Sequence, residues 1–198
     1  MSQILKHPFF LNLNKKRLSF LKKILIIFKI NLLVITLFTS SAQATTSFVD
    51  SFNVSSQESL PTDVTFNNDG TKMFVTGNSG DDVNEYTLST GFDVSTASFV
   101  DSFSVAAQET SPSGIVFNND GTKMFVTGLS GDDVNEYTLS TGFDVSTASF
   151  VDSFSVAAQE TSPSGIVFNN DGTKMFVTGL SGDDVNEYTL STGFDVST

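Results

Sequence analysis

After residue 44 the chain alternates short apolar runs with polar turns, and this pattern predicts β-strands. In the middle of the chain the runs are FVDSFSV, GIVF, KMFVT and VNEYTL, at residues 99–105, 114–117, 123–127 and 134–139. Each run has the length and alternation of a short strand, and no helical spacing of apolar residues occurs after residue 44. We therefore expect four strands here, with Phe99, Phe103 and Val105 on one face of the first.

The polar segments between the runs predict the connections. Residues 118–121, Asn-Asn-Asp-Gly, suit the positive φ angles of a tight hairpin, and residues 128–133 predict a second hairpin turn. Residues 106–113 are expected to form a loop, because Pro112 lacks the N–H that a central strand would use. Two antiparallel hairpins therefore share the middle strand.

The same pattern occurs three times. The units are residues 48–98, 99–149 and 150–198, with every landmark 51 residues apart, and the first differs from the second at ten positions. A fixed period near 50 residues with four short strands is the content of one β-propeller blade. Both faces of these strands are partly apolar, which favours blades stacked between neighbours. We predict an all-β fold of three tandem four-stranded blades; a parallel β-helix is an alternative, but its coils are usually shorter and lack such hairpins.

The run GIVFNNDGTKMFVTG, followed by DDVNEYTLS, resembles the YVTN and NHL type of β-propeller repeat found in lactonase-like proteins. The resemblance covers residues 48–198, although the unit is longer than the YVTN form by residues 142–148. It implies that the GIVF run is the innermost strand of a blade and the FVDSFSV run the outermost. On that assignment residues 48–54 form an outer strand without a blade of their own, and the last blade lacks an outer strand.

Three blades are fewer than the four to eight of typical closed propellers. Two arrangements fit this number. Copies of the chain pair head to tail into a larger ring as a homo-oligomer, or the chain is a partial arc or a fragment of a longer array. The second is favoured, because the sequence stops inside a connection at residues 195–198.

Residues 1–44 predict a signal peptide. They carry six lysines, one arginine and no acidic residue, and an apolar run at residues 30–38 precedes Ala42-Gln43-Ala44, which matches a signal-peptidase site. A membrane anchor is the alternative, but the run is short for a span of about 20 residues. We expect cleavage after Ala44 and a secreted, periplasmic or cell-surface location, with no membrane contact afterwards.

The remaining chain is strongly acidic. It carries 22 acidic residues and three lysines, with no Arg, His, Cys or Trp. This charge disfavours binding to nucleic acid.

Nearly identical blades place the same residue type at each equivalent position around the propeller axis. A catalytic site instead needs different side chains to act as acid, base and electrophile. We expect a non-enzymatic binding or scaffolding protein without catalytic residues. The alternative is a fragment of a lactonase-like propeller hydrolase whose catalytic blades are not in this chain.

The candidate binding residues lie in the polar loops. Connections 106–113 and 128–133 are expected at the same rim of the blade, as an acidic face for a protein or carbohydrate partner. The candidate ligand-binding residues there are Gln108, Glu109, Gln159 and Glu160. Carboxylates after each Ser-Gly pair are candidate calcium ligands; they are Asp81, Asp82, Glu85, Asp132, Asp133, Glu136, Asp183, Asp184 and Glu187. A solvated turn is the favoured interpretation of these carboxylates, so no cofactor is expected.

Overall fold

The computed structural model describes residue 15, residues 17–25 and residues 45–198. The chain divides into two units, Met1–Phe48 and Val49–Thr198. In the first unit residues 17–25 are helical, and no helix among the described residues is long and apolar enough to cross a membrane. The apolar run and the cleavage motif within residues 30–44 lie outside the described residues, so the signal peptide stays a prediction.

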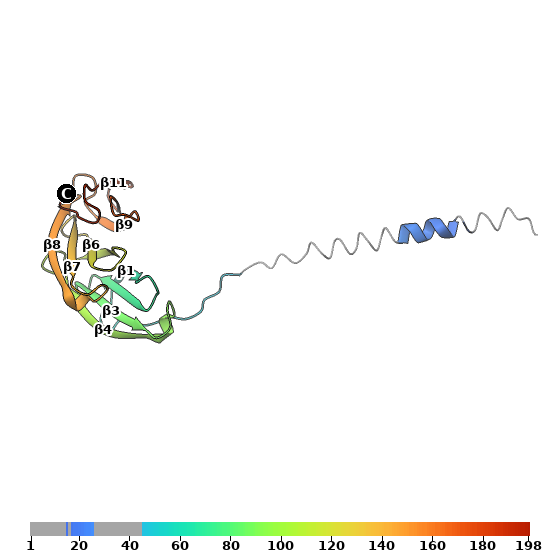
Figure 1. The fold of residues 1–198 in the computed structure, drawn as a ribbon, viewed down its shortest axis with the longest axis horizontal. Coiled ribbons are helices and arrows are strands. Elements are labelled where there is room, and N and C mark those ends of the chain that lie inside the picture. The colour runs from blue at the N-terminus through green and yellow to red at the C-terminus, as the bar shows by residue number, and fades with distance from the viewer. Residues whose placement is uncertain (1–14, 16, 26–44) are drawn as a thin grey trace, which may run out of the picture. The chain divides into compact units, whose positions relative to one another are not determined.

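The second unit consists of three antiparallel sheets placed side by side (Figure 1). Blade 1 contains, in order, β1 (Pro61–Phe66), β2 (Lys72–Gly77), β3 (Asp82–Leu88) and β4 (Ala97–Ser104). Blade 2 contains β5 (Pro112–Phe117), β6 (Lys123–Gly128), β7 (Asp133–Leu139) and β8 (Ala148–Ser155). Blade 3 contains β9 (Pro163–Phe168), β10 (Lys174–Gly179) and β11 (Val185–Thr189). Short 3-10 helices, η1 (Val94–Thr96) and η2 (Val145–Thr147), precede β4 and β8. The predicted blades are confirmed, and the last one lacks an outer strand as expected.

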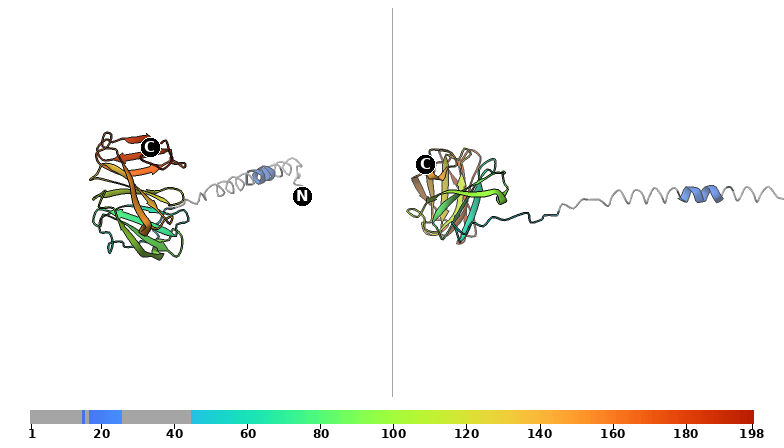
Figure 2. Two further views of the ribbon diagram at one scale, coloured as in Figure 1. Left: turned by 60° about the vertical axis from the view of Figure 1, so that its left-hand side comes forward. Right: turned by 90° about the horizontal axis from the view of Figure 1, so that it is seen from below.

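The first strand of each blade is the inner one. β1 contacts β5 and β5 contacts β9, and the Ser113 hydroxyl donates a 2.7 Å hydrogen bond to the Pro163 carbonyl. The left view of Figure 2 shows the blades stacked one beside the next. The loop prediction was wrong at Pro112 and Ser113, which open β5. Proline is tolerated there because the first residue of an edge strand needs no N–H for the ladder.

Phe99 and Phe103 do not share a face, contrary to the prediction. β3 and β4 pair with a register shift between Glu85 and Tyr86, which is a β-bulge. A bulge reverses the alternation of faces, so Phe99 meets Tyr86 of its own blade at 5.7 Å between ring centroids, whereas Phe103 meets Tyr137 of blade 2 at 5.5 Å. The outer strand therefore contacts two blades.

Residues 48–54 were expected to form an outer strand, and this is wrong for the chain by itself. They have no strand partner, and Val49 is 89% exposed. Two side chains of this segment nevertheless lie against blade 1. Phe52 meets Tyr86 edge-on at 5.5 Å, and Val54 packs against the same apolar cluster. Phe52 thus occupies on blade 1 the position that Phe103 occupies on blade 2.

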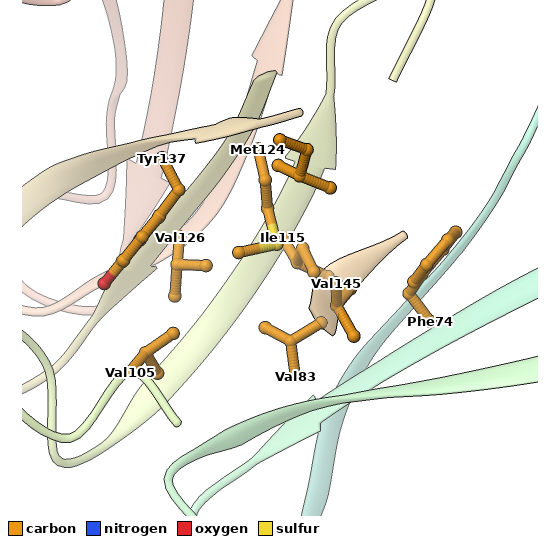
Figure 3. Packing of buried hydrophobic residues seen from close by; sticks show 9 residues of the cluster. Phe74, Val83, Val105, Ile115, Met124, Val126, Tyr137 and Val145 are labelled. Carbon is orange, nitrogen blue, oxygen red and sulfur yellow. The ribbon is translucent and has the colours of Figure 1, made fainter. Parts of the chain in front are cut away.

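The hydrophobic core lies between the blades. Phe74 and Val83 of blade 1 are fully buried against side chains of blade 2 (Figure 3). The other labelled members of this cluster are Val105, Ile115, Met124, Val126, Tyr137 and Val145. The same contact recurs between blades 2 and 3, where Phe125 and Val134 are buried. Stacking of neighbouring blades therefore buries the apolar faces.

Each of the two blade junctions is also held by a lysine and a glutamate, which together we call the clasp. Lys72 Nζ lies 2.7 Å from Glu85 Oε1 in blade 1. From there Lys72 donates to the Phe143 carbonyl of blade 2, and Glu85 Oε2 accepts from the Val145 N–H at 3.0 Å. Lys123 and Glu136 hold blade 3 in the same way, through the Phe194 carbonyl and the Val196 N–H. The clasp thus satisfies buried backbone groups of the following blade.

The Asp-Gly turn requires glycine. Gly121 has a φ of 73°, and a Cβ built there would lie 2.3 Å from two ring atoms of Phe143. The Phe143 N–H donates to the Gly121 carbonyl at 3.0 Å, which ties the connection after β7 to this turn. The turn therefore fixes the loop that the clasp grips.

We expect Gly121→Ala to lower the free energy of unfolding by about 2 kcal/mol, because alanine would be strained at positive φ and would displace Phe143. Gly131→Ala is the matched control, since a Cβ there comes no closer than 3.4 Å to any atom. Urea unfolding of both variants measures the difference. Equal losses would contradict the role assigned to the turn.

Candidate functional site

The blade loops gather at two rims. The rim that we call the glutamate rim holds, in blade 2, residues 105–111 and 129–132. Glu109 accepts hydrogen bonds there from the N–H groups of Ser130 at 3.1 Å and Gly131 at 3.1 Å. The opposite rim, the Asp-Gly rim, holds residues 118–122 and 140–147. The expected placement of the connections on two rims is confirmed.

Glu109 and Glu160, candidate ligand-binding residues, are fully buried. The carboxylate of Glu109 also accepts from the Ser111 N–H at 2.7 Å, and Glu160 accepts the same set of bonds in blade 3. Glu58 holds the corresponding loop of blade 1. These carboxylates tie two loops of a blade together, and their burial does not support contact with a ligand.

Gln108 and Gln159, the other candidates, lie at the glutamate rim, where Gln108 is partly buried and Gln159 is exposed. The Tyr137 hydroxyl lies 3.3 Å from Gln108 Oε1, and Tyr188 and Gln159 make the same contact in blade 3. Burial raises the pKa of Tyr137, and the negative charge of Glu109 raises it further. The tyrosine therefore stays protonated at neutral pH and can act only as a hydrogen-bond partner.

The aspartates proposed as calcium ligands come in pairs at the glutamate rim. Asp132 has a left-handed φ of 54°, and Asp133 opens β7; blades 1 and 3 repeat the pair as Asp81 with Asp82 and Asp183 with Asp184. Burial raises the pKa of Asp82, and repulsion from Asp81 and Glu58 adds to it, although a hydrogen bond with Ser104 opposes the rise. The turn therefore concentrates negative charge at the surface.

Glu85 and Glu136 point away from these aspartates. Both are buried in the blade junctions as parts of the clasp, whereas Glu187 of blade 3 is exposed beside Lys174. Among the described residues no group of three or more His, Cys, Asp or Glu side chains could hold a metal ion. The structure thus separates each glutamate from its aspartate pair, and calcium binding stays a prediction for the aspartates alone.

The Asp-Gly rim is acidic as well, which the sequence analysis did not expect. Its aspartates serve their own turns: Asp120 accepts from the Thr122 hydroxyl at 2.6 Å, and Asp144 caps η2 by accepting from Ser146. The Thr122 hydroxyl and N–H lower the pKa of Asp120, against the opposing effect of burial. Negative charge is therefore present at both rims, and on this rim it also serves the turns.

Two structural roles were not predicted. Lys72 and Lys123 contributed only to the charge count, although a single lysine per repeat, with a glutamate on the next strand of the hairpin, was a visible signal for the clasp. The role of Asp63, one of the ten positions that differ between the first two repeats, was not predicted either. Asp63 Oδ2 accepts from the Ile115 N–H at 2.9 Å and so joins the inner strands of blades 1 and 2.

Comparison with solved structures supports a lactonase-like β-propeller blade fold. No protein-family model matches the sequence, and no curated protein matches it either. A candidate 6-phosphogluconolactonase of Bacteroides fragilis is similar over 67% of this chain, with a TM-score of 0.52 and 16% identity. The periplasmic gluconolactonase of Pseudomonas aeruginosa is similar over 65%, with a TM-score of 0.50 and 18% identity. A functionally unknown protein of Desulfotomaculum acetoxidans is similar over 67%, with a TM-score of 0.51 and 20% identity.

The matched part of the chain spans little more than a third of these proteins, namely 36%, 35% and 40% of their lengths in the same order. The structural similarity supports the fold, and sequence identities this low leave the activity open. The three sheets of residues 61–189 therefore have the fold of lactonase-like propeller blades.

The buried glutamates predict how stability depends on pH. Burial by itself raises the pKa of Glu58, but hydrogen bonds from the Ser79 hydroxyl and nearby backbone N–H groups outweigh it and lower the pKa; backbone bonds do the same for Glu160. A lowered folded-state pKa stabilises the fold above the unfolded value of about 4.3, and this stability is lost as the pH falls through the folded value.

We therefore expect the melting temperature to fall with acidification below about pH 4.3. Glu58→Gln should melt lower at neutral pH and show a weaker acid dependence, because the charge that accepts these bonds is gone. Asp152→Asn, at an exposed residue of β8, is the control and should behave like the unmodified chain. Circular dichroism melts across this pH range measure both effects, and a melting temperature that rises on acidification would contradict them.

Proposed function

We propose that residues 45–198 form an exported, non-enzymatic module that binds or scaffolds other molecules through its glutamate rim. The observation that carries the proposal is repetition of one acidic turn. Each blade presents an aspartate pair at the same place, as Asp132 and Asp133 do in blade 2. Three aspartate pairs, spaced one blade apart, suit a partner that itself repeats, because several weak contacts then add to a useful affinity.

The side chains that could perform acid–base chemistry have structural tasks. The glutamates of the rim loops are buried under backbone N–H groups, and Lys72 and Lys123 are engaged in the clasp. Tyr137 has a raised pKa. These tasks support a binding role more than a catalytic one.

A protein with basic patches is the partner class that the charge favours. Aspartates attract ammonium and guanidinium groups, and Gln108 at the same rim adds an amide that can form hydrogen bonds with protein or sugar groups. Export by the predicted signal peptide would bring the rim to partners outside the cytoplasm.

A second candidate function rests on the comparisons. Two of the similar structures are described as a candidate 6-phosphogluconolactonase and a gluconolactonase. The blades would then be one part of a lactonase-like hydrolase, with catalytic residues supplied by other blades. The chain spans a minority of those proteins, which fits this role.

Poly-lysine is a suitable probe for the acidic rim. We expect Asp132→Asn with Asp133→Asn to weaken binding of residues 45–198 to immobilised poly-lysine by about fivefold, because two lost surface contacts worth roughly half a kcal/mol each add up to about 1 kcal/mol. The matched control, Asp101→Asn with Asp152→Asn, removes the same charge from exposed positions of the outer strands. Surface plasmon resonance compares the two variants. Equal losses would show that net charge alone attracts the probe and would reject the rim.

Lactone hydrolysis by the blades themselves tests whether the module is non-enzymatic. Residues 45–198 should hydrolyse 6-phosphogluconolactone and gluconolactone no faster than buffer does. A rate above the buffer rate, measured by base uptake at constant pH, would place catalytic residues in these blades and contradict the binding proposal.

A further inference from the structure

Blades 1 and 3 each leave one apolar face without a neighbouring blade. The donor face of blade 3 consists of Val167, Lys174, Val185 and Glu187. Val185 is 69% exposed, whereas Val134, the identical position of blade 2, is fully buried by blade 3. The donor face therefore has the sequence of a junction face and lacks only the blade that would cover it.

The acceptor face lies on blade 1 and contains a cavity of about 350 Å³. It is lined by Phe52, Val54, Pro61, Thr62, Asp63, Val64, Met73, Val75 and Val94. Six of the lining residues, namely Phe52, Val54, Val64, Met73, Val75 and Val94, have counterparts 51 residues later that pack around Phe74 and Val83 at the junction of blades 1 and 2. At Val64 the counterpart is Ile115, which is buried, while Val64 is 51% exposed. The cavity is thus the place on blade 1 where a preceding blade fits.

The two faces also carry the two halves of a clasp. Lys174 and Glu187 form an ion pair on the donor face, and both side chains are about half exposed. The groups that a clasp grips are the Phe92 carbonyl and the Val94 N–H of blade 1, which correspond to Phe143 and Val145 of blade 2. The polar contacts of a third junction are therefore present on one chain, at opposite ends of the stack.

The unpaired segment before blade 1 also matches the strand that blade 3 lacks. Blade 3 lacks an outer strand beside β11, and residues 49–54 are an outer-strand sequence without a β partner. Phe52 already lies on Tyr86 as Phe103 lies on Tyr137, with 5.5 Å between ring centroids in both pairs. The segment is consequently held where the outer strand of a preceding blade would run.

We propose that a second copy of the chain docks head to tail, with the donor face of one copy on the acceptor face of the other. Residues 49–53 of one copy then pair with β11 of its partner and complete blade 3. The two junctions inside the chain serve as the template, because the donor-face residues and six of the nine acceptor-face residues are identical to residues already used there; Thr62, Asp63 and Val64 differ from their counterparts Ser113, Gly114 and Ile115. The inference does not depend on which ligand the glutamate rim binds.

Two such contacts allow closure of the stack. Two copies supply six blades, which lies within the usual four to eight of closed propellers, and a two-fold axis makes both contacts identical. Closure would also remove the free edge at β11. The occupant could instead be further blades or a different protein, and in either case the isolated chain would remain monomeric.

Cysteine cross-linking tests the register of the contact. Asn135 pairs with Ser153 between β7 and β8, so the repeat places Ser51 of one copy opposite Asn186 of the other. The chain has no cysteine, so any disulfide reports only the introduced pair. We expect Ser51→Cys and Asn186→Cys chains of residues 45–198, mixed and oxidised, to form a disulfide-linked dimer in high yield.

The matched controls are a mixture of Ser51→Cys with Thr138→Cys, and each single variant alone. Thr138 lies in β7, which is already paired on both sides, so this mixture should give only background cross-linking. Equal yields in all samples would overturn the proposal.

Sedimentation of the unmodified residues 45–198 provides a second test without cross-linking. We expect a mass of two copies, and we expect Val185→Glu to weaken association at least tenfold because it puts a charge on the donor face. Val151→Glu is the control, since Val151 is equally an exposed valine but lies on the outer strand β8. A folded chain that remains monomeric, or equal effects of the two substitutions, would overturn the proposal.

Discussion

The structure depends on the clasp between consecutive blades. A propeller blade cannot stand alone, because its sheet has two apolar faces and burying them requires a neighbour on each side. Apolar packing supplies most of the stabilisation but is not directional. The lysine and glutamate of each clasp add direction, since they reach one carbonyl and one N–H of the following loop. The clasp also engages Lys72 and Lys123 with the blade that follows each of them.

The repeats show how context decides the environment of a residue. Val134 and Val185 occupy the same position in repeats that match at every shared residue, yet one is fully buried and the other is 69% exposed. The difference lies entirely in the presence of a following blade. Near-identical neighbours therefore create faces that fit one another at every junction, and the two faces at the ends of the stack are left with the same specificity.

Much of the fold could be predicted from the sequence, because strand alternation and Asp-Gly turns are local signals. Four strands per repeat, the inner position of β5 and the missing strand of blade 3 were all predicted correctly. The bulge beside Phe99 was not, since it depends on pairing with β3. For the candidate site, the rims were predicted, but the burial of Glu109 was not. A glutamate in a polar loop looks solvated until the loop folds over it.

The central claim is that every junction uses the same clasp, including the one between copies. Hydrogen exchange at the Val94 N–H tests this most directly, because Val94 of blade 1 corresponds to Val145, whose N–H donates a hydrogen bond to Glu85 at 3.0 Å. The account predicts that the Val94 N–H exchanges as slowly as the Val145 N–H in concentrated protein and becomes faster on dilution. Rapid exchange of the Val94 N–H at every concentration would contradict it.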